Sequence, residues 1–218
     1  MSLPSLLGPV VKPASGGKAK QLIVFLHGVG ADGQDLIGLA DEFADSFPDA
    51  QFASPNAPYP CDMAPYGYQW FSLLDRSHDA MLEGVQQAAP IVNQYLDHQL
   101  AALGLDDSNL AIIGFSQGTM TALYTLPRRA KACAAVVGYS GAMIGAEYLG
   151  NEIISRPPVC LIHGQMDEVV PFGAMELAAR ALLEHGVPCK AYAVPNLGHG
   201  IAPSGIQMAI EFLQAHLR

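Results

Sequence analysis

Short apolar runs, each bounded by glycine, proline or asparagine, recur along the chain and predict β-strands. They cover residues 22–26, 51–53, 110–113, 134–137, 159–162 and 191–194. Their apolar positions are continuous rather than alternating, which is typical of strands covered on both faces. We therefore expect an α/β fold with a mostly parallel central sheet and helices on both faces.

Segments with a helical period of apolar residues lie between these runs. They cover residues 35–47, 78–103, 117–126, 173–185 and 205–216. The last places Ile206, Ile210 and Leu213 on one face, and Gly104 and Gly186 are suited to end the helices before them. Since no repeat or linker divides the 218 residues, of which 50% are apolar, we expect residues 1–218 to form one domain around one core.

One connection is longer than such a fold needs. Residues 55–77 are rich in proline, tyrosine and glycine and carry Trp70, the single tryptophan, and Phe71. Long loops at the carboxyl end of a parallel sheet often shape a ligand site, whereas large aromatic residues also anchor loops on a core. Both roles are open for Trp70 and Phe71.

The net charge and the cysteine pattern limit the kinds of binding partner and the cellular compartment that we expect. A formal net charge of −9 without any basic block disfavours nucleic acid and anionic membrane surfaces, and leaves small neutral substrates or a neutral or cationic partner. The four cysteines form no C-x-x-C pair, and Cys133 and Cys160 fall in or beside apolar runs, as buried reduced thiols do. No run has membrane-spanning length and the first 20 residues lack a signal-peptide pattern, so we expect a cytoplasmic protein. An exposed apolar surface could form a homodimer, but nothing in the sequence identifies one.

The most informative motif is Gly114-Phe115-Ser116-Gln117-Gly118. It follows a predicted strand and precedes a predicted helix, the context of a G-x-S-x-G nucleophile elbow. The turn strains the serine backbone and needs glycines where strand and helix come close. The motif predicts that Ser116 is a catalytic nucleophile.

A nucleophilic serine needs a histidine to take its proton and a carboxylate to orient that histidine. In α/β-hydrolases both follow the serine in the order acid, then histidine, in loops after later strands. Asp167 follows the run 159–162, and His199 follows the run 191–194 between two glycines. We therefore predict Asp167 and His199 as partners of Ser116, with Glu168 as a distant second choice for the acid.

The other histidines fit structural roles better. Those in or at the ends of helical segments are typical solvated surface residues: His78, His98, His185 and His216. His27 and His163 each precede a glycine at a strand end, where a hydrogen bond that joins loops is the simpler role.

The oxyanion formed during acyl transfer needs two backbone N–H donors. One belongs to the residue after the nucleophile, Gln117, and the second to a loop after an early strand. The glycine-rich turn Leu26-His27-Gly28-Val29-Gly30 supplies that loop, and Val29 is the predicted donor.

With these pieces together, the sequence resembles the phospholipase/carboxylesterase family of α/β-hydrolases, which includes bacterial carboxylesterases and acyl-protein thioesterases. The resemblance runs over nearly the whole chain. Its markers are the segments 26–33, 55–58, 70–71, 114–118, 163–171 and 198–199. It implies a triad of Ser116, Asp167 and His199, oxyanion donors at Val29 and Gln117, and no cofactor or metal.

The resemblance also implies an acyl-ester substrate, and leaves its class open. The leading prediction is a carboxylesterase for short- to medium-chain esters; the alternatives are an acyl-protein thioesterase or lysophospholipase with the same triad, and a binding module without turnover. Residues 140–158 are too few for a helical lid, so we expect an open cleft near Trp70, Phe71, Met143 and Ile144. Thr119 and Ser72 depart from the common family pattern, and we expect both near the substrate pocket.

Overall fold

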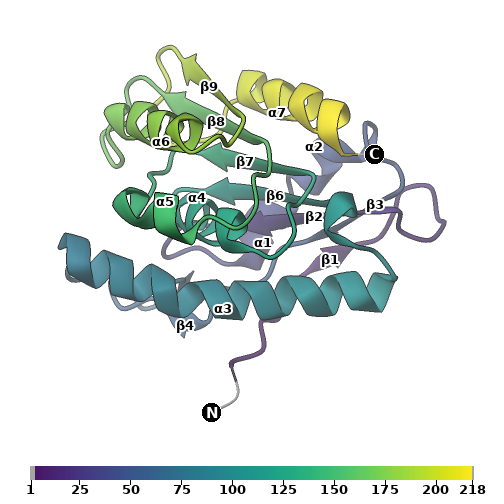
Figure 1. Cartoon of the computed structure of the whole chain (residues 1–218). Coiled ribbons are helices and arrows are strands. Elements are labelled where there is room, and N and C mark those ends of the chain that lie inside the picture. Colours follow the sequence, from purple (N-terminus) through teal and green to yellow (C-terminus); the bar gives the residue numbers. More distant parts are fainter. Residues whose placement is uncertain (1–2, 218) are drawn as a thin grey trace.

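A seven-stranded sheet forms the centre of the molecule (Figure 1), and the computed structural model describes residues 3–217. The strand order is β1-β3-β2-β6-β7-β8-β9, and only β1 pairs antiparallel with its neighbour. The strands are β1 (Val10–Val11), β2 (Gln21–Leu26), β3 (Ala50–Ala53), β6 (Leu110–Phe115), β7 (Ala135–Tyr139), β8 (Val159–Gly164) and β9 (Cys189–Val194). The mostly parallel α/β architecture expected from the sequence is confirmed.

Helices cover both faces of this sheet, because successive strand residues point to opposite sides. The helices are α1 (Gly33–Ile37), α2 (Ala40–Ala44), α3 (His78–Leu103), α4 (Gln117–Thr125), α5 (Leu149–Glu152), α6 (Gly173–Glu184) and α7 (Pro203–His216). In β2, Leu22 and Val24 belong to the core cluster that includes residues of α3, α4 and α6, whereas Ile23 and Phe25 belong to the cluster that includes residues of α1, α2 and α7. Short 3-10 turns η1 (Asp107–Asn109), η2 (Leu126–Arg128) and η3 (Ala146–Tyr148) complete the connections.

Two segments differ from the prediction. The single helix expected over residues 35–47 is wrong, because α1 ends before Gly38 and α2 begins at Ala40. Glycine carries a high entropic cost inside a helix, and the Asp32 side chain caps α1 upstream of the predicted start. The long loop 55–77 contains a small hairpin of β4 (Tyr59–Pro60) and β5 (Tyr68–Gln69), which the sequence pattern did not reveal.

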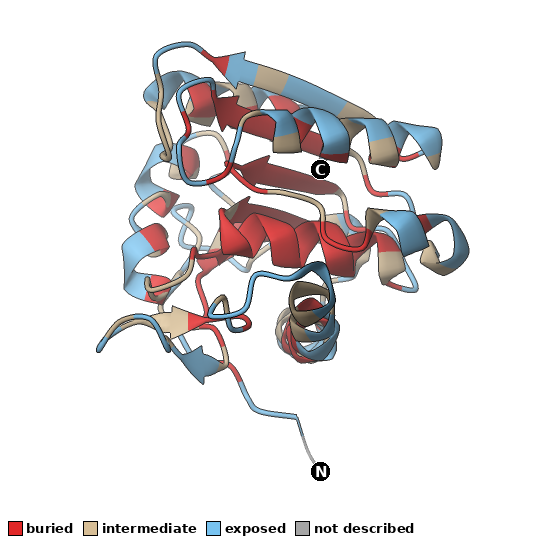
Figure 2. Cartoon of the chain, turned by 90° about the vertical axis from the view of Figure 1, so that its left-hand side faces the viewer, coloured by how far each residue is buried: buried red, intermediate tan, exposed pale blue. Residues whose placement is uncertain are grey.

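The helix α4 is buried along its whole length (Figure 2). It lies against β6, β7 and β2 on one side and α3 on the other. Its small and apolar residues allow this burial on all sides. The turn that leads into α4 is therefore held from every side.

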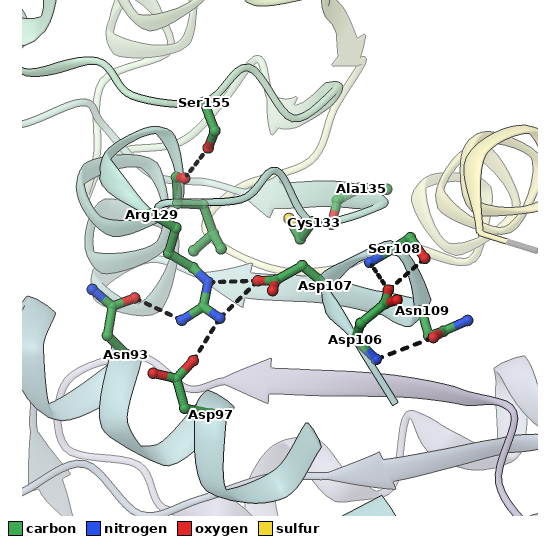
Figure 3. A network of polar contacts seen from close by, with 11 residues as sticks. Asn93, Asp97, Asp106, Asp107, Ser108, Asn109, Arg129, Cys133, Ala135 and Ser155 are labelled. Atoms are coloured by element: carbon green, nitrogen blue, oxygen red, sulfur yellow. Dashed lines mark hydrogen bonds and ion pairs between the residues drawn. The ribbon is translucent and has the colours of Figure 1, made fainter. Parts of the chain in front are cut away.

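A buried arginine ties α3 to the turn before β6 (Figure 3). The Arg129 side chain is only 7% exposed, and its Nη2 donates to Asp107 Oδ1 and Asp97 Oδ1, each at 2.7 Å. Its Nη1 donates to Asn93 Oδ1 at 3.0 Å. Burial alone would lower the pKa of Arg129, but the hydrogen bonds to both carboxylates outweigh it and raise the pKa. The network compensates the buried cation and fixes the position of α3.

In the part of the chain that the structure describes, no helix combines the length and the apolar character that a membrane span requires.

Candidate active site

Ser116 occupies a strained turn between β6 and α4. Its backbone has φ 53° and ψ −115°, in the region that residues with a side chain rarely adopt. A Cβ on Gly118 would lie 1.8 Å from the Leu26 carbonyl oxygen, and one on Gly114 would lie 2.6 Å from the Thr119 nitrogen. The predicted elbow geometry is thus present, and both glycines are required by close backbone approach.

Asp167 and His199 meet beside this turn, from the loops that follow β8 and β9. His199 Nδ1 lies 2.8 Å from Asp167 Oδ2, while Oδ1 of the same carboxylate accepts the backbone N–H groups of Val169 and Val170, each at 2.9 Å. Burial acts to raise the pKa of Asp167, but hydrogen bonds from His199, Val170 and Val169 outweigh it and lower the pKa. The carboxylate therefore stays ionised and accepts a hydrogen bond from the Nδ1–H group of His199, which leaves Nε2 without a proton and able to act as the base.

A second histidine touches the same carboxylate. His163, 1% exposed, places Nε2 2.9 Å from the Val170 carbonyl oxygen and 3.2 Å from Asp167 Oδ2. Since a carbonyl oxygen only accepts, Nε2 carries the proton and also faces the carboxylate. The sequence predicted a structural hydrogen bond for His163 but not its contact with Asp167.

The imidazole of His199 lies next to the nucleophile turn. Its ring packs against Phe115, the residue before Ser116, with centroids 4.9 Å apart and planes at 45°. The loops after β8 and β9 thus hold the Asp167–His199 pair against Phe115, directly before Ser116, at the edge of the sheet where ligand sites of parallel sheets lie.

Two backbone donors lie beside Ser116. A Cβ built on Gly28 would lie 3.4 Å from Ser116 Cβ, so the loop after β2 lies in close contact with the serine. Val29 is the next residue in that loop. Among residues 3–217, neither the Val29 N–H nor the Gln117 N–H has a hydrogen-bond partner. Both groups are free to bind a substrate oxygen.

The long loop is fastened to this region by buried hydrogen bonds. The Gln117 side chain accepts from the Trp70 backbone N–H at 2.9 Å and donates to the Phe71 carbonyl oxygen at 2.7 Å. Trp70 Nε1 in turn donates to the His27 carbonyl oxygen at 2.9 Å. The side chain of Gln117 thus has a positioning role that the sequence motif did not reveal.

His27 also forms a hydrogen bond to the long loop 55–77. Its Nε2 accepts the Ala57 N–H at 3.0 Å, so the proton lies on Nδ1, which donates to the Gly28 carbonyl oxygen at 2.7 Å. Burial lowers the pKa of His27 and keeps this neutral form. The structural role predicted for His27 agrees with these contacts.

A cavity of about 250 Å³ opens beside Ser116. Most of its wall is apolar, and Arg76 is its one ionisable side chain. The residues that line it are Val29, Leu73, Arg76, Met81, Ser116, Gln117, Met120, Ala142, Val169, Val170, Pro171 and Ala174.

None of the four residues predicted to bind substrate lines this cavity. Trp70 and Phe71 are buried in the core, and neither they nor Met143 and Ile144 line the cavity beside Ser116. For Trp70 the anchoring role is the one with visible contacts, because its indole bonds to a backbone carbonyl. Their prediction as substrate contacts thus gains no support from the wall of this cavity.

The two departures from the family pattern also lie away from the cavity wall. Thr119 Oγ1 donates to the Tyr139 carbonyl oxygen at 2.8 Å, and its methyl group fills the space beside Gly138 and Gly141. Ser72 lines a separate groove next to α3.

Among the residues that the structure describes, none of the remaining candidates forms a hydrogen bond or ion pair with Asp167 or His199. His78, His98 and His216 are exposed and His185 is partly buried, and Glu168 is exposed beside Asp167. Within residues 3–217 no three His, Cys, Asp or Glu side chains are grouped so that they could hold a metal ion.

Esterases are among the known proteins that are similar to this chain. A model of the phospholipase/carboxylesterase family matches residues 9–217. The crystal structure of esterase PE8 superposes with a TM-score of 0.94 at 42% identity, over 98% of this chain and 100% of that one. Acyl-protein thioesterase 2 of Zea mays superposes with a TM-score of 0.78 at 27% identity, over 97% of this chain and 100% of that one.

A sequence relative agrees with this picture. Esterase YpfH of Escherichia coli K12 is 28% identical over 196 residues, which cover 90% of this chain and 83% of that protein. The family model matches nearly the whole chain, and esterases are among the relatives of the chain. Together these matches show that the protein is a hydrolase of the carboxylesterase type. The chain belongs to the phospholipase/carboxylesterase family.

Proposed function

We propose that the protein is a serine carboxylesterase that hydrolyses short- to medium-chain esters through an acyl-enzyme on Ser116. The observation that carries this proposal is the pairing of the buried Asp167 carboxylate with His199 Nδ1 at 2.8 Å, next to a serine in a strained turn. Such a pair leaves Nε2 of the imidazole basic and orients it. A plain structural role would not need the strain at Ser116.

In the proposed reaction, His199 Nε2 takes the proton of Ser116 Oγ while Oγ forms a bond to the ester carbonyl carbon. The N–H groups of Val29 and Gln117 bind the oxyanion of the tetrahedral intermediate. Its collapse breaks the bond to the alcohol oxygen, which receives the proton from His199 and leaves. Water then attacks the acyl-enzyme by the same proton transfers and releases the carboxylic acid.

The test is turnover of p-nitrophenyl esters of increasing acyl length by the wild type and by Ser116→Ala. We expect turnover with an optimum at short to medium acyl length, and a loss of roughly 10⁴-fold or more in the variant. Ser204→Ala, at an exposed serine of α7, is the matched control and should keep wild-type rates. Wild-type turnover by folded Ser116→Ala would contradict the proposal.

A second candidate function uses the same residues on another leaving group. The likeness to an acyl-protein thioesterase, at 27% identity, supports hydrolysis of protein thioesters, and the apolar cavity supports lysophospholipids as substrates. Palmitoylated peptide, lysophosphatidylcholine and p-nitrophenyl butyrate should be compared by kcat/KM. A clear preference for either of the first two would replace the carboxylesterase assignment.

A binding module without turnover is the competing class. Such modules usually lack a member of the triad, whereas Ser116, Asp167 and His199 are all present. The absence of turnover on every ester and thioester, with failure of a fluorophosphonate to label Ser116, would favour that class.

We further propose that the protein acts in the cytoplasm. All four cysteines are unpaired, and burial raises the pKa of both Cys133 and Cys160 to about 12. Such thiols suit a reducing compartment. Fractionation of cells that produce the protein would test this location.

A further inference from the structure

We propose that Arg76 binds an anionic group at the far end of the acyl chain, so that the preferred substrates are esters with a carboxylate on their acyl part. This inference rests on the proposed function, because it assumes that the acyl chain occupies the cavity beside Ser116. It adds a substrate class that neither the family nor the triad specifies.

The wall of the cavity places Arg76 where it can meet an acyl chain bound to Ser116. Ser116 and Gln117 are buried at its inner part, whereas Arg76 is exposed and lies at the rim. The Gln117 side-chain amide is held by Trp70 and Phe71 through one hydrogen bond at each end, and it carries no charge that could pair with an anion. Arg76 is thus the polar side chain that an acyl chain meets when it extends from Ser116 toward solvent.

The guanidinium of Arg76 pairs with no carboxylate in the part of the chain that the structure describes. Its one hydrogen bond among residues 3–217 runs from Nε to the Leu73 carbonyl oxygen at 3.4 Å. The neighbouring Asp75 binds the Ser77 N–H at 2.8 Å instead. The two terminal nitrogens of Arg76 are therefore available for a bidentate contact with a carboxylate.

The surroundings add to this preference. Helix α3 begins at His78, two residues after Arg76, and Met81 of its first turn lines the cavity. The N-terminal turn of α3, which carries the positive end of the helix dipole, therefore lies near the same wall. The chain as a whole carries −9, so its long-range field repels anions, and attraction of a carboxylate depends on this local positive charge.

The test compares two methyl esters of similar size in a pH-stat: methyl hydrogen adipate, which carries a terminal carboxylate, and methyl hexanoate, which does not. We expect Arg76→Gln to lower the ratio of their kcat/KM values by about two- to fivefold, since an exposed charge-assisted contact is lost. Arg76→Lys should restore part of the ratio, and added salt should lower it in the wild type. Arg180→Gln, at an exposed arginine of α6, should leave both rates unchanged.

Three outcomes would decide against the proposal. An unchanged ratio in Arg76→Gln, with wild-type turnover of methyl hexanoate present, would overturn the anion site and leave the esterase function standing. If the substitution affects only an ester with its carboxylate on the alcohol part, such as the butyrate ester of glycolic acid, the assignment to the acyl part is wrong. If the wild type hydrolyses no ester at all, the proposed function fails first, and this inference fails with it.

Discussion

Replacing Asp167 by asparagine removes a charge and keeps the shape of the side chain. Oδ1 accepts two backbone N–H groups, so the asparagine must place its oxygen there, because its NH₂ group would face two donors. The NH₂ group then points at His199 and His163. His199 can accept that hydrogen bond at Nδ1 only if its own proton lies on Nε2 instead of Nδ1.

This change of tautomer removes the base. With the proton on Nε2, His199 cannot take one from Ser116, and the positive charge that forms on the imidazole is no longer stabilised by a carboxylate. We expect kcat to fall by roughly 10³- to 10⁴-fold, equivalent to about 4–5.5 kcal/mol of transition-state free energy. KM should change much less, since Asp167 does not line the cavity.

The assay is kcat and KM on p-nitrophenyl butyrate, with circular dichroism and Tm as controls for folding. Glu168→Gln neutralises the adjacent exposed carboxylate and should keep wild-type kcat within about twofold. Retention of more than a tenth of wild-type kcat in folded Asp167→Asn, or an equal loss in Glu168→Gln, would refute the reasoning.

Three further predictions concern stability. Gly118→Ala should prevent soluble expression or lower Tm sharply, because its Cβ would overlap the Leu26 carbonyl oxygen, and a wild-type Tm would contradict the close approach. Arg129→Ala leaves the partly buried Asp107 unpaired and should cost about 2 kcal/mol in urea unfolding, with kcat of the folded enzyme unchanged. The pKa of Asp167 is lower in the folded protein than in the unfolded chain, so its ionised form stabilises the fold above the ordinary aspartate pKa. This stabilisation is lost as the pH falls through the lowered pKa. Urea unfolding at falling pH should therefore show a smaller acid-induced loss of stability in Asp167→Asn than in the wild type.

The sequence predicted the strands and most helices because their signals are local. Continuous apolar runs gave the parallel strands, and α3 spans His78–Leu103 as its periodicity indicated. The break at Gly38 was missed because both the apolar period and the helical backbone dihedrals continue through it, and only the hydrogen bonding changes, as in the bond from the Leu39 N–H to the Leu36 carbonyl oxygen. The hairpin of β4 and β5 lacks a strong alternating pattern, and its pairing depends on contacts with the loop after β2, such as Gly30 N–H to the Tyr68 carbonyl oxygen at 2.8 Å.

Part of the candidate site could likewise be predicted from the sequence, and part of it could not. Motif order along the chain placed Ser116, Asp167 and His199 together, because each follows a strand of one parallel sheet. The wall of the cavity could not be predicted, since Arg76, Met81 and Met120 come together only through the packing of the long loop, α3 and α4. A fully buried tryptophan and a pocket-lining tryptophan look identical in sequence, and only the packing separates them.

The central claim is that Ser116 is the nucleophile. The direct measurement is mass spectrometry of the protein after reaction with a fluorophosphonate, followed by peptide mapping. The account predicts a single adduct on the peptide that contains Ser116, lost in Ser116→Ala and strongly slowed in Asp167→Asn. An active enzyme that carries no adduct, or carries it on another residue, would contradict the account.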